Sequence, residues 1–236
     1  MASSKPVLGY WHIRGLASQV RLMLHYAEVD FEDKVYEIGP APEHNKDCWF
    51  SVKQTLGLDF PNLPYFFDGD VNLTETAAIM KYIARKWSPG LLGHTPAEYA
   101  TSEMLAEFVG HLKRALTMPS YTGGDFGKDI TCQQLAESAY PHLERVLNFK
   151  KSKGHKWLAG ENLTWIDFFF WEIVDYLAWL TKGGVVEKYP ELGHYHKEFL
   201  ALPTIAKVWG DDVKCQKYPW NNSFALIGGR DSTIMP

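Results

Sequence analysis

Apolar and polar residues follow two different rhythms in the first 87 residues. A short apolar run at 7–12 is followed by a polar turn, and apolar side chains then recur with helical spacing over 20–26. This pattern predicts a strand and then a helix. A second strand is expected over 34–38, because the stretch 39–46 that follows holds two prolines and several polar residues that favour a loop. The order indicates a β-α-β unit.

Two more strand-like runs stand close together later in this part of the chain. Residues 64–68 and 71–74 flank the dipeptide Gly69-Asp70, which predicts a hairpin with a short turn. A helical pattern over 75–87 closes the block. A β-α-β unit followed by β-β-α predicts one small mixed sheet with helices packed against it, which is a thioredoxin-like outline.

The pattern changes after a break at 88–93 that contains proline and glycine. Helical patterns then continue from 96 to about 209. We therefore expect two domains: residues 1–88 with a thioredoxin-like α/β fold and residues 89–236 with an all-helical fold. The apolar run 165–180 carries three carboxylates and is shorter than the about 20 residues of a membrane span, which indicates a buried helix.

The start of that helix carries its own signal. Thr164 is followed three residues later by Asp167, the spacing of a capping box in which the hydroxyl accepts from a free amide and the carboxylate reaches back. Leu163 and Phe168 are placed to pack across the helix start. The helix is expected to begin at this point.

Composition and charge exclude several classes of function. The chain of 236 residues is 46% hydrophobic and 22% charged, with a formal net charge of -4, so it lacks the excess of cations that binds a nucleic-acid backbone. Residues 1–6 contain no basic region leading into an apolar stretch that directs secretion, and we expect the protein in the cytoplasm. Cys48, Cys132 and Cys215 are odd in number and far apart, which favours reduced thiols over disulfides.

Several blocks of sequence resemble one family. Residues 9–17, Gly-Tyr-Trp-His-Ile-Arg-Gly-Leu-Ala, closely resemble the N-terminus of mu-class cytosolic glutathione transferases. Blocks 56–65, 78–79 and 82–86 resemble the same class, and 163–167 is similar to the helix-start motif of the family. Residues 210–236 match poorly. The resemblance implies a thioredoxin-like domain that binds glutathione and a helical domain that contributes the electrophile site.

Tyr10 is the residue to which this resemblance assigns the central chemistry. A thiol with a pKa near 8.5 is only a few per cent thiolate at neutral pH, yet the thiolate is the nucleophile. A phenol hydroxyl can donate a hydrogen bond to the sulfur and favour its charged form. Tyr10 would hold the glutathione sulfur as a thiolate, and the alternative is that it is one more aromatic residue in an aromatic-rich chain.

The resemblance also implies a set of glutathione-binding residues. They are Tyr10, Trp11, Leu16, Lys46, Trp49, Lys53, Asn62, Leu63, Glu75 and Thr76. For Lys46, Trp49 and Lys53 the alternative is a solvated loop with a buried tryptophan. Pro64 stands where the family has a cis-proline.

Three positions depart from the usual mu pattern. Lys46 stands where mu enzymes usually carry arginine, which keeps the charge but loses the bidentate fork. Glu75 replaces a glutamine, and His111 occupies the position from which the family commonly supplies an acidic residue to the partner subunit. Glu75 is a candidate to replace that missing charge.

The electrophile site and the dimer contact follow from the same resemblance. Trp11, Leu16, Gly110 and Tyr121 would line an apolar pocket, with Tyr121 donating to developing negative charge; a plain surface-loop role for Tyr121 is the alternative. Phe60 would insert into the other subunit of a homodimer, or else belong to the core of its own domain.

The resulting hypothesis is conjugation of glutathione to apolar electrophiles, a detoxifying transferase reaction. Glutathione is the co-substrate, and no metal or redox cofactor is expected, since His194 and His196 would point to different faces of a helix. Two alternatives are a protein that chiefly binds hydrophobic ligands and a glutathione-dependent eicosanoid isomerase. Nucleic acid and membranes are not expected partners. The sequence does not specify which electrophiles are accepted.

Overall fold

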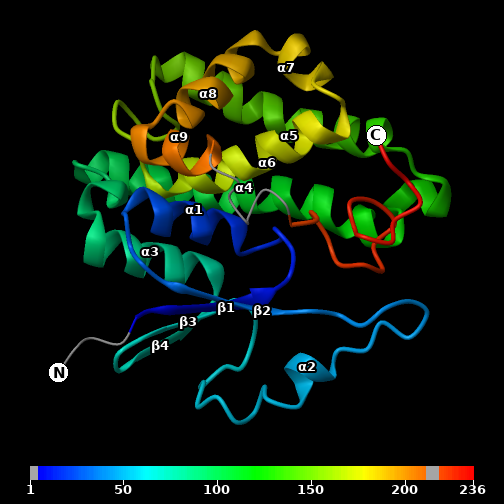
Figure 1. The fold of residues 1–236 in the computed structure, drawn as a ribbon. Coiled ribbons are helices and arrows are strands. Elements are labelled where there is room, and N and C mark those ends of the chain that lie inside the picture. The colour runs from blue at the N-terminus through cyan, green and yellow to red at the C-terminus, as the bar shows by residue number, and fades with distance from the viewer. Residues whose placement is uncertain (1–4, 211–217) are drawn as a thin grey trace.

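Four strands form one mixed sheet near the N-terminal end of the chain (Figure 1). The computed structural model describes residues 5–210 and 218–236. Strands β1 (Val7–Trp11), β2 (Glu32–Tyr36), β3 (Tyr65–Asp68) and β4 (Val71–Thr74) lie in the order β2-β1-β3-β4. β1 pairs in parallel with β2, and the other pairs are antiparallel. The expected β-α-β unit and hairpin are confirmed.

Helices cover the sheet and separate it from the second half of the chain. α1 (Ser18–Tyr26) and α3 (Thr76–Trp87) lie between the sheet and the helical part, and the short α2 (Asp47–Phe50) lies on the other side of the sheet (Figure 1). Leu8 of β1, Phe66 of β3 and Met23 of α1 are fully buried in the core. The turn that follows the carboxyl end of β1 reaches the helical part, where Arg14 contacts Glu172.

The second strand begins and ends two residues earlier than the sequence pattern predicted. β2 pairs residue by residue with β1, from Val7 with Glu32 to Trp11 with Tyr36. Glu37 and Ile38 lie beyond Tyr36, which pairs with Trp11, the last residue of β1. They therefore have no partner in the ladder. The expectation of a strand over 34–38 was wrong because the end of the partner strand, not local composition, sets the end of β2.

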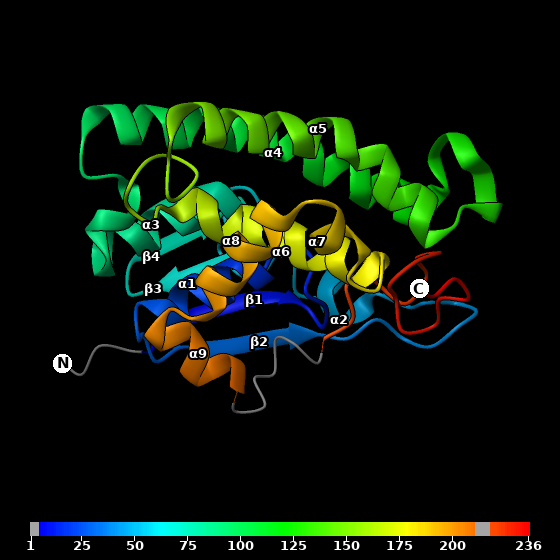
Figure 2. The same ribbon diagram turned by 90° about the horizontal axis from the view of Figure 1, so that it is seen from above.

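Residues 89–210 are helical, as the pattern predicted, but the all-helical fold expected up to 236 was wrong for 218–236, which form no helix. A 3-10 turn (η1, Pro89–Leu92) leads into α4 (Pro96–Thr122); a second turn (η2, Gly124–Asp129) precedes α5 (Cys132–Lys153). Then come α6 (Trp165–Leu180), α7 (Gly184–Lys188), α8 (Pro190–Leu200) and α9 (Pro203–Gly210). Figure 2 shows α4 and α5 side by side along one edge of the molecule, with α6 beneath them. Within the described residues, no helix is both long and apolar enough to cross a bilayer.

The buried helix α6 begins where the capping pattern placed it. The Asp167 carboxylate accepts from the main-chain N–H of Thr164 at 2.8 Å and from that residue's hydroxyl at 2.9 Å. It also accepts from the N–H of Leu158 and the hydroxyl of Tyr195, both at 3.0 Å. Burial raises the pKa of Asp167 from 3.8 to about 6, and these hydrogen bonds oppose the rise.

The last described residues, 218–236, form an irregular segment that we call the C-terminal strap. It runs along the end of α4, on the same side as the loop before α2 (Figure 1). The carbonyl of Ser120 accepts from the N–H groups of Leu226 and Ile227 at 2.8 and 3.1 Å. The strap is thus joined to α4 by main-chain hydrogen bonds.

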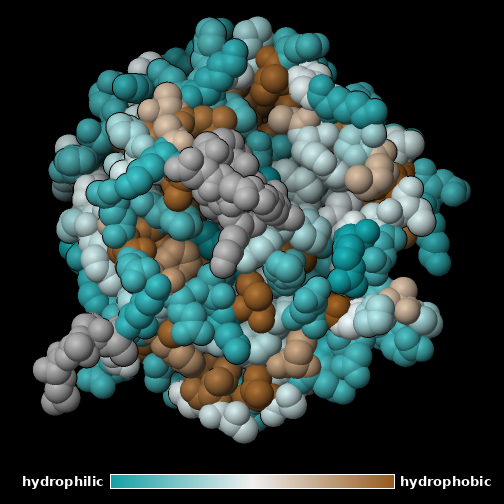
Figure 3. Space-filling view, in the orientation of Figure 1, coloured by the Kyte–Doolittle hydropathy of each residue, from teal (hydrophilic) through white to brown (hydrophobic). Residues whose placement is uncertain are grey.

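The surface holds small apolar patches and an exposed cysteine. Figure 3 shows apolar side chains on this face in separate small patches among hydrophilic ones, including a patch at its lower edge. Cys48 is exposed and Cys132 is buried, and both are free thiols. Cys215 lies outside the described residues.

Candidate functional site

Tyr10 is the last residue but one of β1, and only 6% of its surface is exposed. Its hydroxyl oxygen accepts a hydrogen bond from the main-chain N–H of Leu16 at 3.0 Å. Because the oxygen is the acceptor in this contact, its own proton remains available for donation to another group. Burial raises the pKa of Tyr10 to about 12, so the phenol stays protonated at neutral pH and can act as a donor.

Gly15 makes the close approach of this loop to Tyr10 possible. Its φ of +44° lies in the left-handed region, where other residues are strained. A Cβ at this position would lie 2.7 Å from the Tyr10 hydroxyl oxygen. The turn from 12 to 17 therefore needs glycine here for two reasons, the backbone conformation and the space.

The start of α3 lies on the other side of Leu16. The hydroxyl of Thr76, the first residue of α3, donates to the carbonyl of Leu16 at 3.5 Å. The preceding residue, Glu75, is exposed and has a φ of 69°. A helix N-terminus of this length presents free N–H groups that favour an anion. The Leu63–Pro64 peptide bond is cis, as the sequence resemblance implied.

Three of the expected glutathione-binding residues, Lys46, Trp49 and Lys53, lie in and around α2. Trp49 is buried, and its ring is stacked on Tyr65 and meets Tyr36 edge to face. The Nζ of Lys46 lies 4.3 Å from the ring centre of Phe224, which belongs to the strap. Lys53 lies over the ring of Phe50. The alternative of a buried tryptophan describes the packing of Trp49, while both lysine ammonium groups lie over aromatic rings.

Tyr121 lies in the last turn of α4 and not in a loop. The helix continues through Pro119 and ends at Gly123, which caps it in the left-handed conformation with a φ of 80°. The surface-loop alternative was wrong because Pro119 and Gly123 mark the final turn of the helix. The Tyr121 hydroxyl accepts from the N–H of Asn222 at 2.9 Å, and its ring lies 5.4 Å from that of Phe224.

Tyr121 and Gly110 both belong to α4. They are eleven residues apart, which is about three helical turns, so they lie on one face of α4. No atom lies within 4 Å of a Cβ added at Gly110, so space is open beside it. Electrostatic interaction with Tyr121 is a minor contribution to the raised pKa of Tyr10, after burial.

Two cationic residues at this site had no role in the sequence analysis. The Nζ of Lys113 on α4 donates to the carbonyl of Gly15 at 3.4 Å, and burial lowers the pKa of this ammonium. The guanidinium of Arg14 donates to Glu172 through Nε and an Nη atom at 2.9 and 2.7 Å, and to Asp175 at 2.7 Å. The motif around residues 9–17 contains Arg14, which was the signal available, but its partners on α6 are 158 and 161 residues away in sequence.

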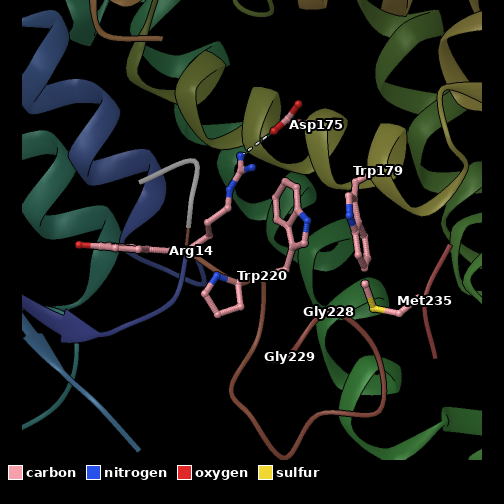
Figure 4. Close-up of a pocket in the computed structure, with 9 residues that line it drawn as sticks. Arg14, Asp175, Trp179, Trp220, Gly228, Gly229 and Met235 are labelled. Carbon is pink, nitrogen blue, oxygen red and sulfur yellow. Dashed lines mark hydrogen bonds and ion pairs between the residues drawn. The ribbon is translucent and has the colours of Figure 1, made fainter. Parts of the chain in front are cut away.

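A cavity of about 470 Å³ lies between Arg14, α6 and the C-terminal strap (Figure 4). Its walls include Trp179, Trp220 and Met235, and its polar side is formed by Arg14 and Asp175. In Figure 4 the Trp220 ring lies beside the Arg14 side chain, which reaches Asp175; the guanidinium carbon is 3.5 Å from the centre of that ring.

Three further residues are placed as follows. Phe60 is 79% exposed, so the alternative that it belongs to the core of its own domain is wrong. His111 is exposed on α4. Nε2 of His196 is hydrogen-bonded to Asp175 at 3.0 Å. Among residues 5–210 and 218–236, no group of three or more His, Cys, Asp or Glu side chains could hold a metal ion.

Comparison with known proteins gives one consistent result. A family model described as "Glutathione S-transferase, N-terminal domain" matches residues 6–85, and one described as "Glutathione S-transferase, C-terminal domain" matches residues 125–209. "Glutathione S-transferase" of Dermatophagoides pteronyssinus is 34% identical over 232 residues, which cover 94% of this chain and 100% of the relative. "Glutathione S-transferase Mu 3" of Homo sapiens is 34% identical over 227 residues, or 96% and 97% of the two chains.

A solved structure agrees with these relatives. The crystal structure of the glutathione S-transferase Blo t 8 superposes with a TM-score of 0.81 at 32% sequence identity, covering 94% of this chain and 99% of that one. The sheet and the helical part described above are therefore arranged as in that protein.

Proposed function

Because this chain belongs to the glutathione S-transferase family and resembles its mu class, we propose that Tyr10 is the residue that holds the glutathione sulfur as a thiolate during transfer. The observation that carries this proposal is the hydrogen bond from the Leu16 N–H to the Tyr10 hydroxyl oxygen. It fixes the phenol and leaves its proton to be donated to the sulfur. A donor of this kind favours the thiolate over the thiol.

The rest of the tripeptide would lie between α3 and α2. The N–H groups at the start of α3 and the Thr76 hydroxyl bind the γ-glutamyl carboxylate, and the main chain of Leu63 pairs with the cysteinyl residue. Lys46, Trp49 and Lys53 hold the glycyl carboxylate. Trp11, Leu16 and Asn62 complete the glutathione site.

Glu75 would bind the γ-glutamyl ammonium. It is exposed at the start of α3, and the position from which related enzymes supply a partner acid is His111 here. Glu75→Gln should weaken glutathione binding, measured by calorimetry. Asp70→Asn should not, since Asp70 is an exposed acid in the β3–β4 turn, at the other end of β4 from Glu75. An unchanged affinity in Glu75→Gln would remove this assignment.

The electrophile would lie between Tyr10 and α4. Trp11, Leu16, Gly110 and Tyr121 form its walls, and Tyr121 donates to charge that develops on the electrophile. Support comes from the open space at Gly110 and from the position of Gly110 and Tyr121 on one face of α4. Apolar electrophiles are the substrate class that fits these walls.

The assembly and the domain division are part of the same proposal. We propose a homodimer in which the exposed Phe60 inserts into the partner subunit. The division into residues 1–88 and 89–236 is supported by the position of η1, at Pro89–Leu92, between the sheet and α4. The cytoplasmic location and the lack of a resident cofactor beyond glutathione stay predictions. The two alternatives, a ligand-binding protein and an eicosanoid isomerase, are not favoured by the relatives.

The test compares wild type with Tyr10→Phe in conjugation of glutathione to an aryl halide. We expect kcat to fall about 100-fold, since one donor to the developing anion is lost, while the KM for glutathione changes little. Tyr65→Phe is the matched control, since Tyr65 is another buried tyrosine of the same sheet and is bonded to Tyr36. Equal turnover in Tyr10→Phe and wild type would defeat the assignment.

A further inference from the structure

We propose that Arg14 is a positioning residue for Tyr10, through which helix α6 of the second half of the chain sets how well the phenol stabilises the glutathione thiolate. The proposal rests on the function proposed for Tyr10. It assigns a role to an ion-pair cluster that makes no contact with the reacting sulfur itself.

The side chain of Arg14 links the two halves of the chain. It is buried, and it donates to Glu172 in the bidentate manner that fixes both position and orientation. Asp175, one turn later on α6, accepts from the same guanidinium and also bonds His196 on α8. Glu172 in turn accepts from the hydroxyl of Ser18 at 2.9 Å. The cluster thus joins the start of α1 to α6 and α8.

The main chain on both sides of Leu16 is held by the same neighbourhood. The N–H of Arg14 donates to the carbonyl of Pro219 at 2.8 Å, and the N–H of Gly15 donates to that of Trp220 at 3.2 Å. Lys113 donates to the carbonyl of Gly15. The carbonyl of Arg14 accepts from Ala17 and Ser18 as α1 begins. Leu16 lies inside this fixed turn, and its N–H is the group that orients Tyr10.

Arg14 acts on Tyr10 through geometry and not through its charge at a distance. A hydrogen bond weakens steeply when its angle or length departs from the favoured values, so a small shift of the Leu16 N–H changes where the Tyr10 proton points. Loss of one carboxylate from a buried cluster leaves the guanidinium partly unpaired, which is costly and promotes such a shift. The pKa of the bound glutathione thiol should then move towards its solution value.

Glu172→Gln separates this proposal from simple electrostatics. Removing a negative charge near the site would, through space, stabilise the thiolate and lower the thiol pKa. Loss of positioning would raise it instead. The direction of the change therefore decides between the two effects, while Arg14→Lys keeps the charge and removes only the bidentate fork.

The experiment is a pH titration of the ultraviolet thiolate absorbance of bound glutathione, alongside kcat/KM for an aryl halide over the same pH range. For Glu172→Gln and Arg14→Lys we expect the thiol pKa to rise by about 0.5–1 unit and kcat/KM at pH 6.5 to fall about 3- to 10-fold, with recovery at pH 9 and glutathione affinity within about twofold of wild type. Arg230→Gln is the control, because Arg230 of the strap pairs with an acid of the first domain, Glu37, but its side chain is 47% exposed against 6% for Arg14.

The possible outcomes are distinct. A thiol pKa that stays at the wild-type value or falls in folded Glu172→Gln would overturn the proposal, even if the melting temperature drops. If Glu172→Gln does not fold, Ser18→Ala, which removes one hydrogen bond from Glu172, must show a smaller rise in the same direction, and no rise there overturns it equally. If wild type itself gives no thiolate absorbance with glutathione, the function proposed for Tyr10 fails instead.

Discussion

The N–H of Leu16 donates to the hydroxyl oxygen of Tyr10 at 3.0 Å across the turn that joins β1 to α1. This contact has a consequence for the chemistry, because a phenol whose oxygen is an acceptor within the protein has its proton free for an external group. The raised pKa of about 12 has the same effect, since a phenol that stays protonated keeps a proton to donate. The two features together favour a hydrogen-bond donor to sulfur over a general base.

Gly15→Ala should lower kcat/KM much more than Gly57→Ala does, although both should lower the unfolding free energy to a similar extent. Both the positive φ and the 2.7 Å approach to the Tyr10 hydroxyl oppose an added methyl group, and displacement of the phenol should lower kcat/KM about 10- to 100-fold. The control is Gly57→Ala, because Gly57 has a φ of +69° but nothing within 4 Å of its Cβ. Both variants should lose about 1–2 kcal/mol of unfolding free energy from the backbone alone. Equal activity in the two would show that the contact with Tyr10 has no catalytic effect.

Asp167→Ala should destabilise the protein strongly without a direct effect on the glutathione site. The substitution leaves the N–H groups of Leu158 and Thr164 buried without their acceptor, which should cost about 2–4 kcal/mol in urea unfolding. Gln134→Ala is the comparison, since Gln134 holds the same position in the capping box of α5 but is exposed. Its loss should be below about 1 kcal/mol. Similar losses for both would mean that burial of the cap adds nothing.

The raised pKa of Asp167 gives a pH dependence with a definite sign. Between about pH 4 and pH 6 the folded protein retains a proton that the unfolded chain has released, because the folded pKa of about 6 lies above 3.8. The contribution of the protonated Asp167 carboxyl to the unfolding free energy is therefore complete below pH 4 and is lost as the pH rises towards 6. The difference in unfolding free energy between wild type and Asp167→Asn should decrease over that range. An increase over the same range would mean that the hydrogen bonds outweigh burial.

Phe60→Ser should weaken the proposed dimer. Removal of an aromatic anchor at the centre of an interface costs about 2 kcal/mol or more of association free energy, which sedimentation at several protein concentrations would detect as monomer. Phe50→Ser is the matched control, because Phe50 is also exposed, at 56%, and belongs to the same domain. A dimer of unchanged stability in Phe60→Ser would place the interface elsewhere.

The order of elements could be predicted from the sequence because each break carries its own chemical signal. Gly69-Asp70 marks the hairpin turn and Thr164 with Asp167 marks the start of α6, and both signals depend only on neighbouring residues. The end of β2 was misjudged because it depends on the last residue of another strand. Local patterns predict elements better than they predict where pairing stops.

The parts of the site that the sequence did not predict depend on contacts over long separations. The partners of Arg14 on α6 cannot be identified from the motif that contains it. The strap is held largely by main-chain groups, such as the carbonyls of Pro219 and Ser120, and these are chemically alike in every residue. Tyr10 was assigned by family resemblance, and its orientation by Leu16 became visible only in the structure.

The attachment of the C-terminal strap has a practical consequence for handling the protein. The strap supplies an N–H group that donates to the Tyr121 hydroxyl and two carbonyls that accept from the N–H groups of Arg14 and Gly15. It also supplies the aromatic ring over which the Lys46 ammonium lies. Deletion of residues 218–236 would therefore disturb the glutathione-binding part and the electrophile-binding part of the proposed site at once. Kinetic constants measured on such a chain would describe the missing strap as much as the enzyme.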